Sequence, residues 1–426
     1  MIRDGADSEL VFFRVALNKL GERGVSILRG ASQEKLEMIL MKRYFELAML
    51  LVAATCGLHA QVIDTTVCDV LKSPQSFDNK IVRIKGTVVA GFDQFVIRDE
   101  NCAQDVNGIW LAYPQGTKGK AGPMAMLELK PAKNFAGTAA APTARAAVVL
   151  DKSKDFKEFD NKLAELHSKG TALCMGCVQN TVMATVVGRL DGVASATFKR
   201  DASGKITTLG GFGSANTYPA RLVIQSVSDV VAKPVDFAKV DAITAADNNN
   251  QGPGQQQSGS NPLADAQKFA AAMNGKPMGD QFAKAVGVFA KPGEQNGVVI
   301  GYGAMNEAAQ ADAPSTQDSP DGLEYHVTFN KDKIKPEAME FALLHMGQHI
   351  ADIRTPVKGN ESAPPRVSES NAWVVSSEAA IWSGQRYVIL PGAYMMWNGK
   401  WPQPEQVQNM QDALKQFLDK EVMMNM

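Results

Sequence analysis

Apolar and polar residues alternate along five short segments in the first half of the chain. These segments are 80–89, 95–99, 108–113, 181–190 and 220–230. A period of two places the apolar side chains on one face of a strand, and glycines punctuate the pattern near the strand ends. A short helix is predicted over 65–71, ahead of the first strand. Short alternating strands of this kind are typical of a small β-barrel or sandwich.

Residues 114–170 separate the third and fourth of these strands, and we interpret them as an insertion. The insertion contains a stretch rich in Ala, Gly and Pro at 135–147. It also contains a segment, 155–167, that predicts an amphipathic helix. Its apolar residues fall on one helical face, at Phe156, Phe159, Leu163 and Leu166.

The second half of the chain contains both the two-residue period of strands and the three- to four-residue spacing of helices. Strands are predicted at 296–300 and 323–329. Apolar residues spaced three and four positions apart predict helices at 265–273, 335–353, 368–377 and 406–420. Pro336 falls in the first turn of the longest helix, a position that proline favours. The sequence therefore predicts an α+β protein.

A polar segment at 244–261 predicts a flexible linker. After Ala246 it consists of Asp, Asn, Gln, Gly, Ser and Pro, so it has nothing with which to form a core. The linker divides the chain into two predicted domains, 61–243 and 262–426.

The N-terminal region predicts export to the periplasm or outside the cell. Met41-Lys42-Arg43 is a basic start, residues 47–58 are apolar but too short to cross a bilayer, and Leu58-His59-Ala60 is an acceptable cleavage site. We therefore expect a signal peptide at 41–60, a natural start at Met38 or Met41, and 1–40 to be a mis-assigned upstream extension. The alternative is a genuine N-terminal helix with a membrane anchor at 45–58. No transmembrane segment is expected in the mature chain.

The charge balance argues against nucleic acid as a partner. The formal net charge is −1, and no basic stripe with interleaved aromatic residues follows the predicted strands.

Removal of the signal peptide with Cys56 would leave four cysteines. An even number in an exported chain predicts disulfides, and we expect Cys68 to pair with Cys102. Cys174 and Cys177 form a CxxC, which suits a redox pair, half of a zinc site or a local disulfide. The local disulfide is favoured, because there is no second CxxC and no thioredoxin-like context.

The helix predicted at 335–353 contains His345-Met346-Gly347-Gln348-His349. Two histidines four residues apart point the same way on a helix and can hold one metal ion. Asp352, one turn after His349, is expected to orient an imidazole. The alternative is a pair of core histidines whose nitrogens are satisfied by other groups.

The order of a strand at 323–329, this histidine helix and a following helix that carries glutamate resembles the gluzincin metallopeptidases over about residues 320–385. The resemblance implies zinc as the metal and a glutamate on the next helix as third ligand. In Ser368-Glu369-Ser370-Asn371-Ala372-Trp373 that role falls to Glu369, with Glu378 as the substitute. It also implies that strand 323–329 borders the cleft. The chain departs from the family at Met346, which stands where the glutamate general base is expected.

The first module resembles an OB-fold-like domain of exported bacterial proteins. The resemblance rests on Val67-Cys68-Asp69-Val70, on the segment 73–80, on Lys85-Gly86-Thr87-Val88, and on Val187-Gly188-Arg189-Leu190. It implies a β-barrel that contains the insertion 114–170.

Taken together, the sequence predicts an exported two-domain protein, with an OB-like barrel followed by a zincin-like domain. Because a thioether cannot accept a proton, we expect a non-catalytic role, either structural or in binding a protein or peptide. One alternative is an active zinc metallopeptidase whose base is Glu361, Glu369 or Glu378. Another is a thiol-redox protein that uses Cys174 and Cys177.

Overall fold

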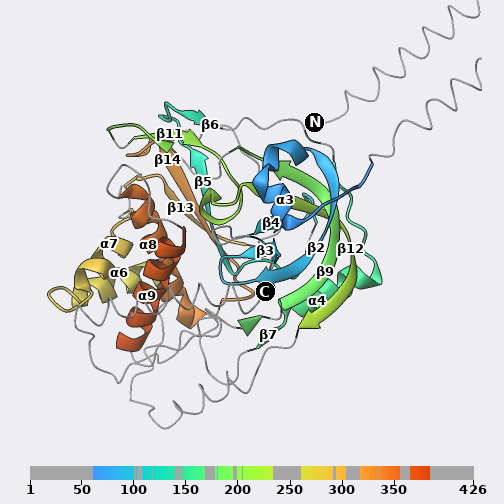
Figure 1. Ribbon diagram of the computed structural model, residues 1–426. Coiled ribbons are helices and arrows are strands. Elements are labelled where there is room, and N and C mark those ends of the chain that lie inside the picture. Colours follow the sequence, from blue (N-terminus) through green and yellow to red (C-terminus); the bar gives the residue numbers. More distant parts are fainter. Residues whose placement is uncertain are drawn as a thin grey trace, which may run out of the picture. The chain divides into compact units, whose positions relative to one another are not determined.

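Figure 1 shows the computed structural model of the protein. It describes residues 61–383, apart from 100–101, 103–107, 118, 140–144, 146, 168–177, 180, 195–198, 204, 234–260, 291–293, 304–316, 335 and 356–364. The described residues from Val62 onward belong to one compact unit. Several sequence predictions lie outside the described residues: those for 1–60, Cys174, Cys177, Glu361, most of the linker and the helix at 406–420.

A six-stranded sheet contains all five strands predicted for the first half. Its order is β1 (Ile63–Asp64), β2 (Lys80–Ala90), β3 (Phe95–Arg98), β4 (Ile109–Ala112), β12 (Ala220–Lys233) and β9 (Thr181–Gly192). β9 also pairs with β2, so the pairings lead from β2 through β3, β4, β12 and β9 back to β2. β4 and β12 are parallel, whereas the other pairings of this series are antiparallel.

Two helices accompany this sheet, and both have a side-chain cap at their start. α3 (Val67–Lys72) begins after Thr66, whose hydroxyl accepts a hydrogen bond from the Asp69 N–H, and a 3₁₀ turn at Pro74–Phe77 follows it. α4 (Lys154–Ala164) buries Phe156, Phe159 and Leu163 in the core of the sheet. α4 ends before the predicted limit of 167, because Leu166–His167 forms the short strand β7, which pairs with β8 (Val178–Gln179).

A second sheet joins the two halves of the chain. β14 (Leu323–Phe329) lies at its centre, parallel to β13 (Val298–Tyr302) and antiparallel to β5 (Ala125–Pro131). β5 comes from the predicted insertion and pairs with β14 along all seven residues. The resemblance implies that strand 323–329 is an edge strand beside the cleft; the edge position is wrong, since β14 has a strand on each side. A third small sheet has the order β10 (Lys199–Arg200), β11 (Ile206–Leu209) and β6 (Thr138–Ala139).

The helices of the second half pack around α8, as Figure 1 shows. α8 (Met339–Arg354) is surrounded by α6 (Pro262–Ala272), α7 (Gly279–Val286) and α9 (Pro365–Trp382). A 3₁₀ turn at Pro336–Ala338 precedes α8. Nearly every residue of α8 is buried, because α6, α7 and α9 all contact it. A histidine on α8 therefore lies inside the protein.

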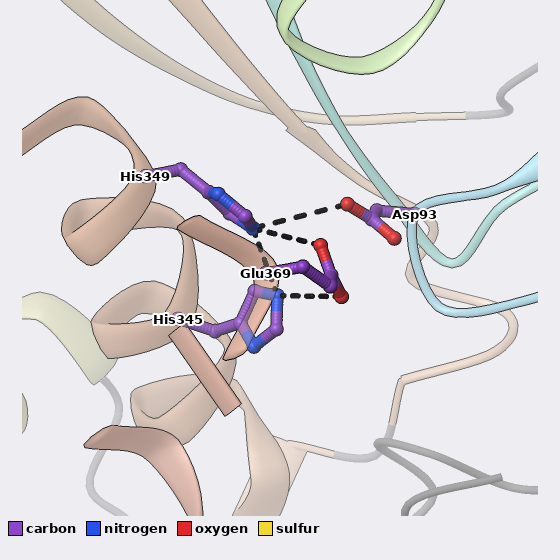
Figure 2. Close-up of side chains that lie close together, drawn as sticks. All are labelled: Asp93, His345, His349 and Glu369. Carbon is purple, nitrogen blue, oxygen red and sulfur yellow. Dashed lines mark hydrogen bonds and ion pairs between the residues drawn. The ribbon is translucent and has the colours of Figure 1, made fainter. Parts of the chain in front are cut away.

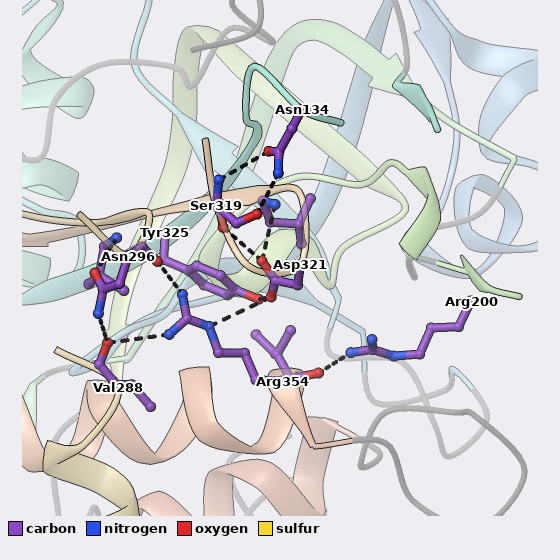
Figure 3. Close-up of polar contacts among 11 residues, drawn as sticks. Asn134, Arg200, Val288, Asn296, Ser319, Asp321, Tyr325 and Arg354 are labelled. Atoms are coloured by element: carbon purple, nitrogen blue, oxygen red, sulfur yellow. Dashed lines mark hydrogen bonds and ion pairs between the residues drawn. The ribbon is translucent and has the colours of Figure 1, made fainter. Parts of the chain in front are cut away.

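The C-terminal end of α8 is fixed by arginines (Figure 3). The Arg354 guanidinium lies 4.7 Å from the centre of the Tyr325 ring and donates to the Asn296 carbonyl at 2.6 Å. Arg200, from the first half, donates to the Ile353 carbonyl. Arg200 thus binds a carbonyl at the end of the helix where carbonyls lack helical partners, and Arg354 ties the same end to the segment that precedes β13.

The hydrophobic core beside α8 also contains residues from both sides of the linker. Phe92, Leu127 and Ile206 share one cluster with Phe282, Leu344 and Val374. A separate cluster consists mainly of residues from the first sheet and from α3 and α4. The α+β class predicted from the sequence is confirmed.

The expected disulfide is present, with Cys68 of α3 bonded to Cys102 after β3. Within the residues that the structure describes, no helix combines the length and the apolar character needed to cross a bilayer.

Candidate metal centre

Four possible metal ligands converge between α8, α9 and the β2–β3 loop (Figure 2). α8 provides His345 and His349, α9 provides Glu369, and the loop provides Asp93. Their ligand atoms all lie within 4.8 Å of one another. The structure thus brings together the three ligands named from the sequence and adds a fourth from the other half of the chain.

The two shortest separations between these atoms are close to those of a tetrahedral ion, and the others are longer. The two imidazole Nε2 atoms are 3.2 Å apart, and His349 Nε2 lies 3.3 Å from Glu369 Oε2. The longer separations are 3.8 Å from His345 Nε2 to Glu369 Oε1 and 3.9 Å from His349 Nε2 to Asp93 Oδ2. Zinc bonds of about 2.0–2.2 Å to nitrogen and oxygen give tetrahedral edges of about 3.3–3.6 Å. The donor set and its geometry therefore fit zinc after small shifts.

Helix α9 orients both imidazoles through serine hydroxyls. His349 Nδ1 contacts Ser368 Oγ at 2.9 Å, and His345 Nδ1 contacts Ser376 Oγ at 3.4 Å. The Ser376 hydroxyl donates to the Trp373 carbonyl, so its oxygen is left to accept from His345. If each Nδ1 carries the proton, both Nε2 lone pairs point at the shared position, which is the arrangement that a metal requires.

Aromatic rings enclose His345. Its ring lies edge-to-face with those of Phe92 and Trp373, at centroid distances of 4.8 and 4.6 Å. The side chains of the four donors are between 0% and 15% exposed. The position between the donors is therefore shielded from solvent, and charge placed there must be balanced locally.

The protonation of the four groups reflects this burial. Burial, followed by the charge of Glu369, raises the pKa of Asp93 to about 8. Burial also lowers the pKa of His345 to about 3. Burial alone would raise the pKa of Glu369. The hydrogen bond with His349 and the charge of His349 outweigh burial and lower this pKa to about 2. The pKa of His349 is raised, because Glu369 and Asp93 together outweigh the effect of burial. The raised pKa values of Asp93 and His349 favour their protonated forms, and a divalent cation would compete with those protons.

Asp352, expected to orient an imidazole, has other partners. Its Oδ1 accepts from Gln348 Nε2 at 2.7 Å, and its Oδ2 accepts from Asn371 Nδ2 at 2.9 Å. Its Oδ1 also lies 3.4 Å from Lys284 Nζ. The Asp352 carboxylate therefore links α8 to α7 and α9, and the histidines take serines as their partners.

The residues between the histidines have packing roles. Met346 is fully buried in the core that surrounds α8. Gly347 lies where α7 crosses α8, and a Cβ there would come within 2.1 Å of the Ala285 carbonyl oxygen. Glu378, the substitute ligand, is fully buried on α9 but does not belong to the group of four donors.

Asp93 carried no usable signal in the sequence. It lies in a hairpin turn closed by a bond from the Gly91 N–H to the Gln94 carbonyl, and aspartate is common in turns for purely local reasons. The pairing of β5 with β14, which brings this loop to α8, joins segments about 200 residues apart.

No protein-family model, no curated protein and no solved structure matches this chain. The nature of the centre is therefore inferred from its geometry and donor chemistry.

Proposed function

We propose that this is an exported, non-catalytic zinc protein in which a gluzincin-like helix pair holds the ion. The observation that carries the proposal is the convergence of His345, His349 and Glu369 with both imidazoles held by serines. These three residues would bind zinc directly. Bound zinc is a Lewis acid and, in such a buried position, also a crosslink between α8 and α9.

We infer further that the first sheet is an OB-like module. One support is the strand pairing, which runs from β2 through β3, β4, β12 and β9 and ends with β9 paired to β2. Further support comes from the parallel pairing of β4 with β12 and from helix α4, which lies between β4 and β9 in the sequence. This module and the helical region would be the two predicted domains, joined into one compact unit by the pairing of β5 with β14.

A peptidase reaction is disfavoured by what surrounds the donors. Hydrolysis at zinc needs a ligand position open to water and a base beside it. Met346 lies in the core and cannot act as a base. Of the three glutamates considered as replacement bases, Glu369 is one of the ligands, Glu378 lies outside the donor group, and Glu361 lies outside the described residues. A structural role for the ion agrees best with these positions.

The test is the metal content of the purified protein beside a His345→Ala/His349→Ala variant. We expect about one zinc per chain in the parent protein, little in the variant, and no zinc-dependent peptide hydrolysis in either. Equal metal content in the two proteins would refute the site. Zinc-dependent hydrolysis that the variant lacks would refute the non-catalytic role.

A further inference from the structure

The loop that carries Asp93 is held in place independently of any ion. The Gly91 N–H donates to the Gln94 carbonyl, and Arg98 Nη2 donates to Gln94 Oε1, both at 2.8 Å. The Phe92 carbonyl accepts from the N–H groups of Met124 and Ala125, at 2.6 and 2.8 Å. The loop is therefore attached to the first residue of β5.

The same loop packs directly on the histidine helix. Phe92 is 3% exposed, and its ring lies edge-to-face with those of His345 and Trp373. The side chain that follows it, Asp93, consequently faces His349 and Glu369 (Figure 2).

β5 extends this attachment along the neighbouring sheet. It pairs antiparallel with β14 from Ala125 opposite Phe329 to Pro131 opposite Leu323. Just beyond this ladder, Lys333 Nζ donates to the Gly122 carbonyl at 2.7 Å, and the Asn330 N–H donates to the Met124 carbonyl. The loop and β5 thus form one rigid cover, which the first half of the chain places over the metal centre and along β14.

Charge balance gives Asp93 a role that three ligands cannot fill. Two neutral imidazoles and Glu369 leave a divalent ion with one uncompensated positive charge, in a site where every donor is largely buried. An unbalanced buried charge is costly. A second carboxylate brings the net charge of the site to zero, and the Asp93 carboxylate already lies within 4.8 Å of all the other donors.

We propose that Asp93 is the fourth ligand and that it closes the centre. The ion then bridges the two sides of the linker, and the first half of the chain excludes any external ligand from it. This inference rests on the proposed function. Four protein ligands without an open position are the signature of structural zinc sites.

The experiment uses the full-length protein with Zn²⁺ and Co²⁺ alone as probes. Asp93→Ala removes the carboxylate, and Asp93→Asn keeps the side-chain shape in case the smaller residue disturbs folding. Asp151→Asn neutralises an exposed carboxylate and serves as the matched control. Both Asp93 variants should bind zinc at least about 30-fold more weakly, which corresponds to the lower end of the cost of leaving a buried charge unpaired. The control should bind zinc like the parent protein.

Acetohydroxamate then reports whether a ligand position is open. The visible absorption of the Co²⁺-loaded parent protein should be that of a four-coordinate ion and should not respond to acetohydroxamate. The Co²⁺-loaded Asp93→Ala protein should respond, because the hydroxamate oxygens can enter the vacated position. A response in the parent protein, or Asp93 variants with undiminished zinc affinity, would overturn the closed centre and leave zinc binding at the other three residues intact. A parent protein that binds neither metal would overturn the proposed function itself.

Discussion

Replacing Ser368 with alanine tests whether helix α9 sets the imidazoles for metal binding. Ser368 Oγ lies 2.9 Å from His349 Nδ1, whereas the equivalent contact of Ser376 with His345 is 3.4 Å, near the limit for a hydrogen bond. Loss of such an outer contact typically lowers metal affinity about 10- to 100-fold, or about 1.4–2.7 kcal/mol. We expect Ser368→Ala to fall at the upper end of this range and Ser376→Ala at the lower end.

The affinity would be measured by competition for Zn²⁺ with a chromophoric chelator, and circular dichroism would confirm that each variant is folded. Ser377→Ala is the matched control. It removes a hydroxyl from the same helix that is also buried but has no hydrogen-bond partner among the described residues. Zinc affinity should be unchanged in this control. If Ser368→Ala bound zinc within about twofold of Ser377→Ala, the serine contact would not set the imidazole, and the reasoning from Nδ1 would fail.

Three further predictions concern stability. Replacing Cys68 and Cys102 by serine releases a disulfide across a sequence separation of 34 residues, and loop entropy predicts a loss of about 4 kcal/mol in guanidinium denaturation; an unchanged midpoint would contradict this. Met346→Glu places a carboxylate in an apolar core, so it should lower the free energy of unfolding by more than about 3 kcal/mol and should not create peptidase activity. Met346→Leu, the control, should lower it by less than about 1.5 kcal/mol. Zinc-dependent hydrolysis by Met346→Glu would show instead that this position faces the ion. Glu340 has a pKa raised from 4.5 to about 7 by burial and then by the charge of Asp265. The folded protein therefore binds more protons between pH 4.5 and 7, so stability should fall as pH rises through this window, and Glu340→Gln should flatten that fall in thermal denaturation.

The local alternation of apolar and polar residues predicts the strands whose side chains alternate between buried and exposed positions. β2, β9, β12 and β14 were predicted within a few residues, because one face of each packs on a core. β5 also alternates, with Leu127 and Leu129 buried and Met126 and Glu128 partly exposed. It lies in the segment 114–170, which the sequence alone indicates to be an insertion, and its partner β14 lies about 200 residues further along the chain. Local periodicity does not contain such long-range pairings.

The residues of the candidate metal centre could likewise be predicted only in part. The spacing of His345 and His349 on one helix predicts that they share a face, and the resemblance to gluzincins added Glu369 from the next helix. Asp93 could not be found, because a hairpin aspartate has local explanations and its approach to α8 depends on the whole fold. The two residues that follow His345 have packing roles. Met346 fills core volume, and Gly347 allows α7 to approach α8 closely.

The position of β5 bears on the two non-catalytic roles, structural and peptide-binding, that the sequence left open. A peptide that bound along this side of β14 would have to displace β5, break its seven-residue ladder and uncover Leu127 and Leu129, which are 0% and 3% exposed. Exposure of each leucine costs about 1.5–3 kcal/mol, so about 3–6 kcal/mol would be lost before the peptide gained any net affinity. The other side of β14 pairs with β13 along five residues. Because both sides of β14 are already paired and a carboxylate of the first half lies against the histidines, these positions favour the proposed structural role over peptide binding along β14.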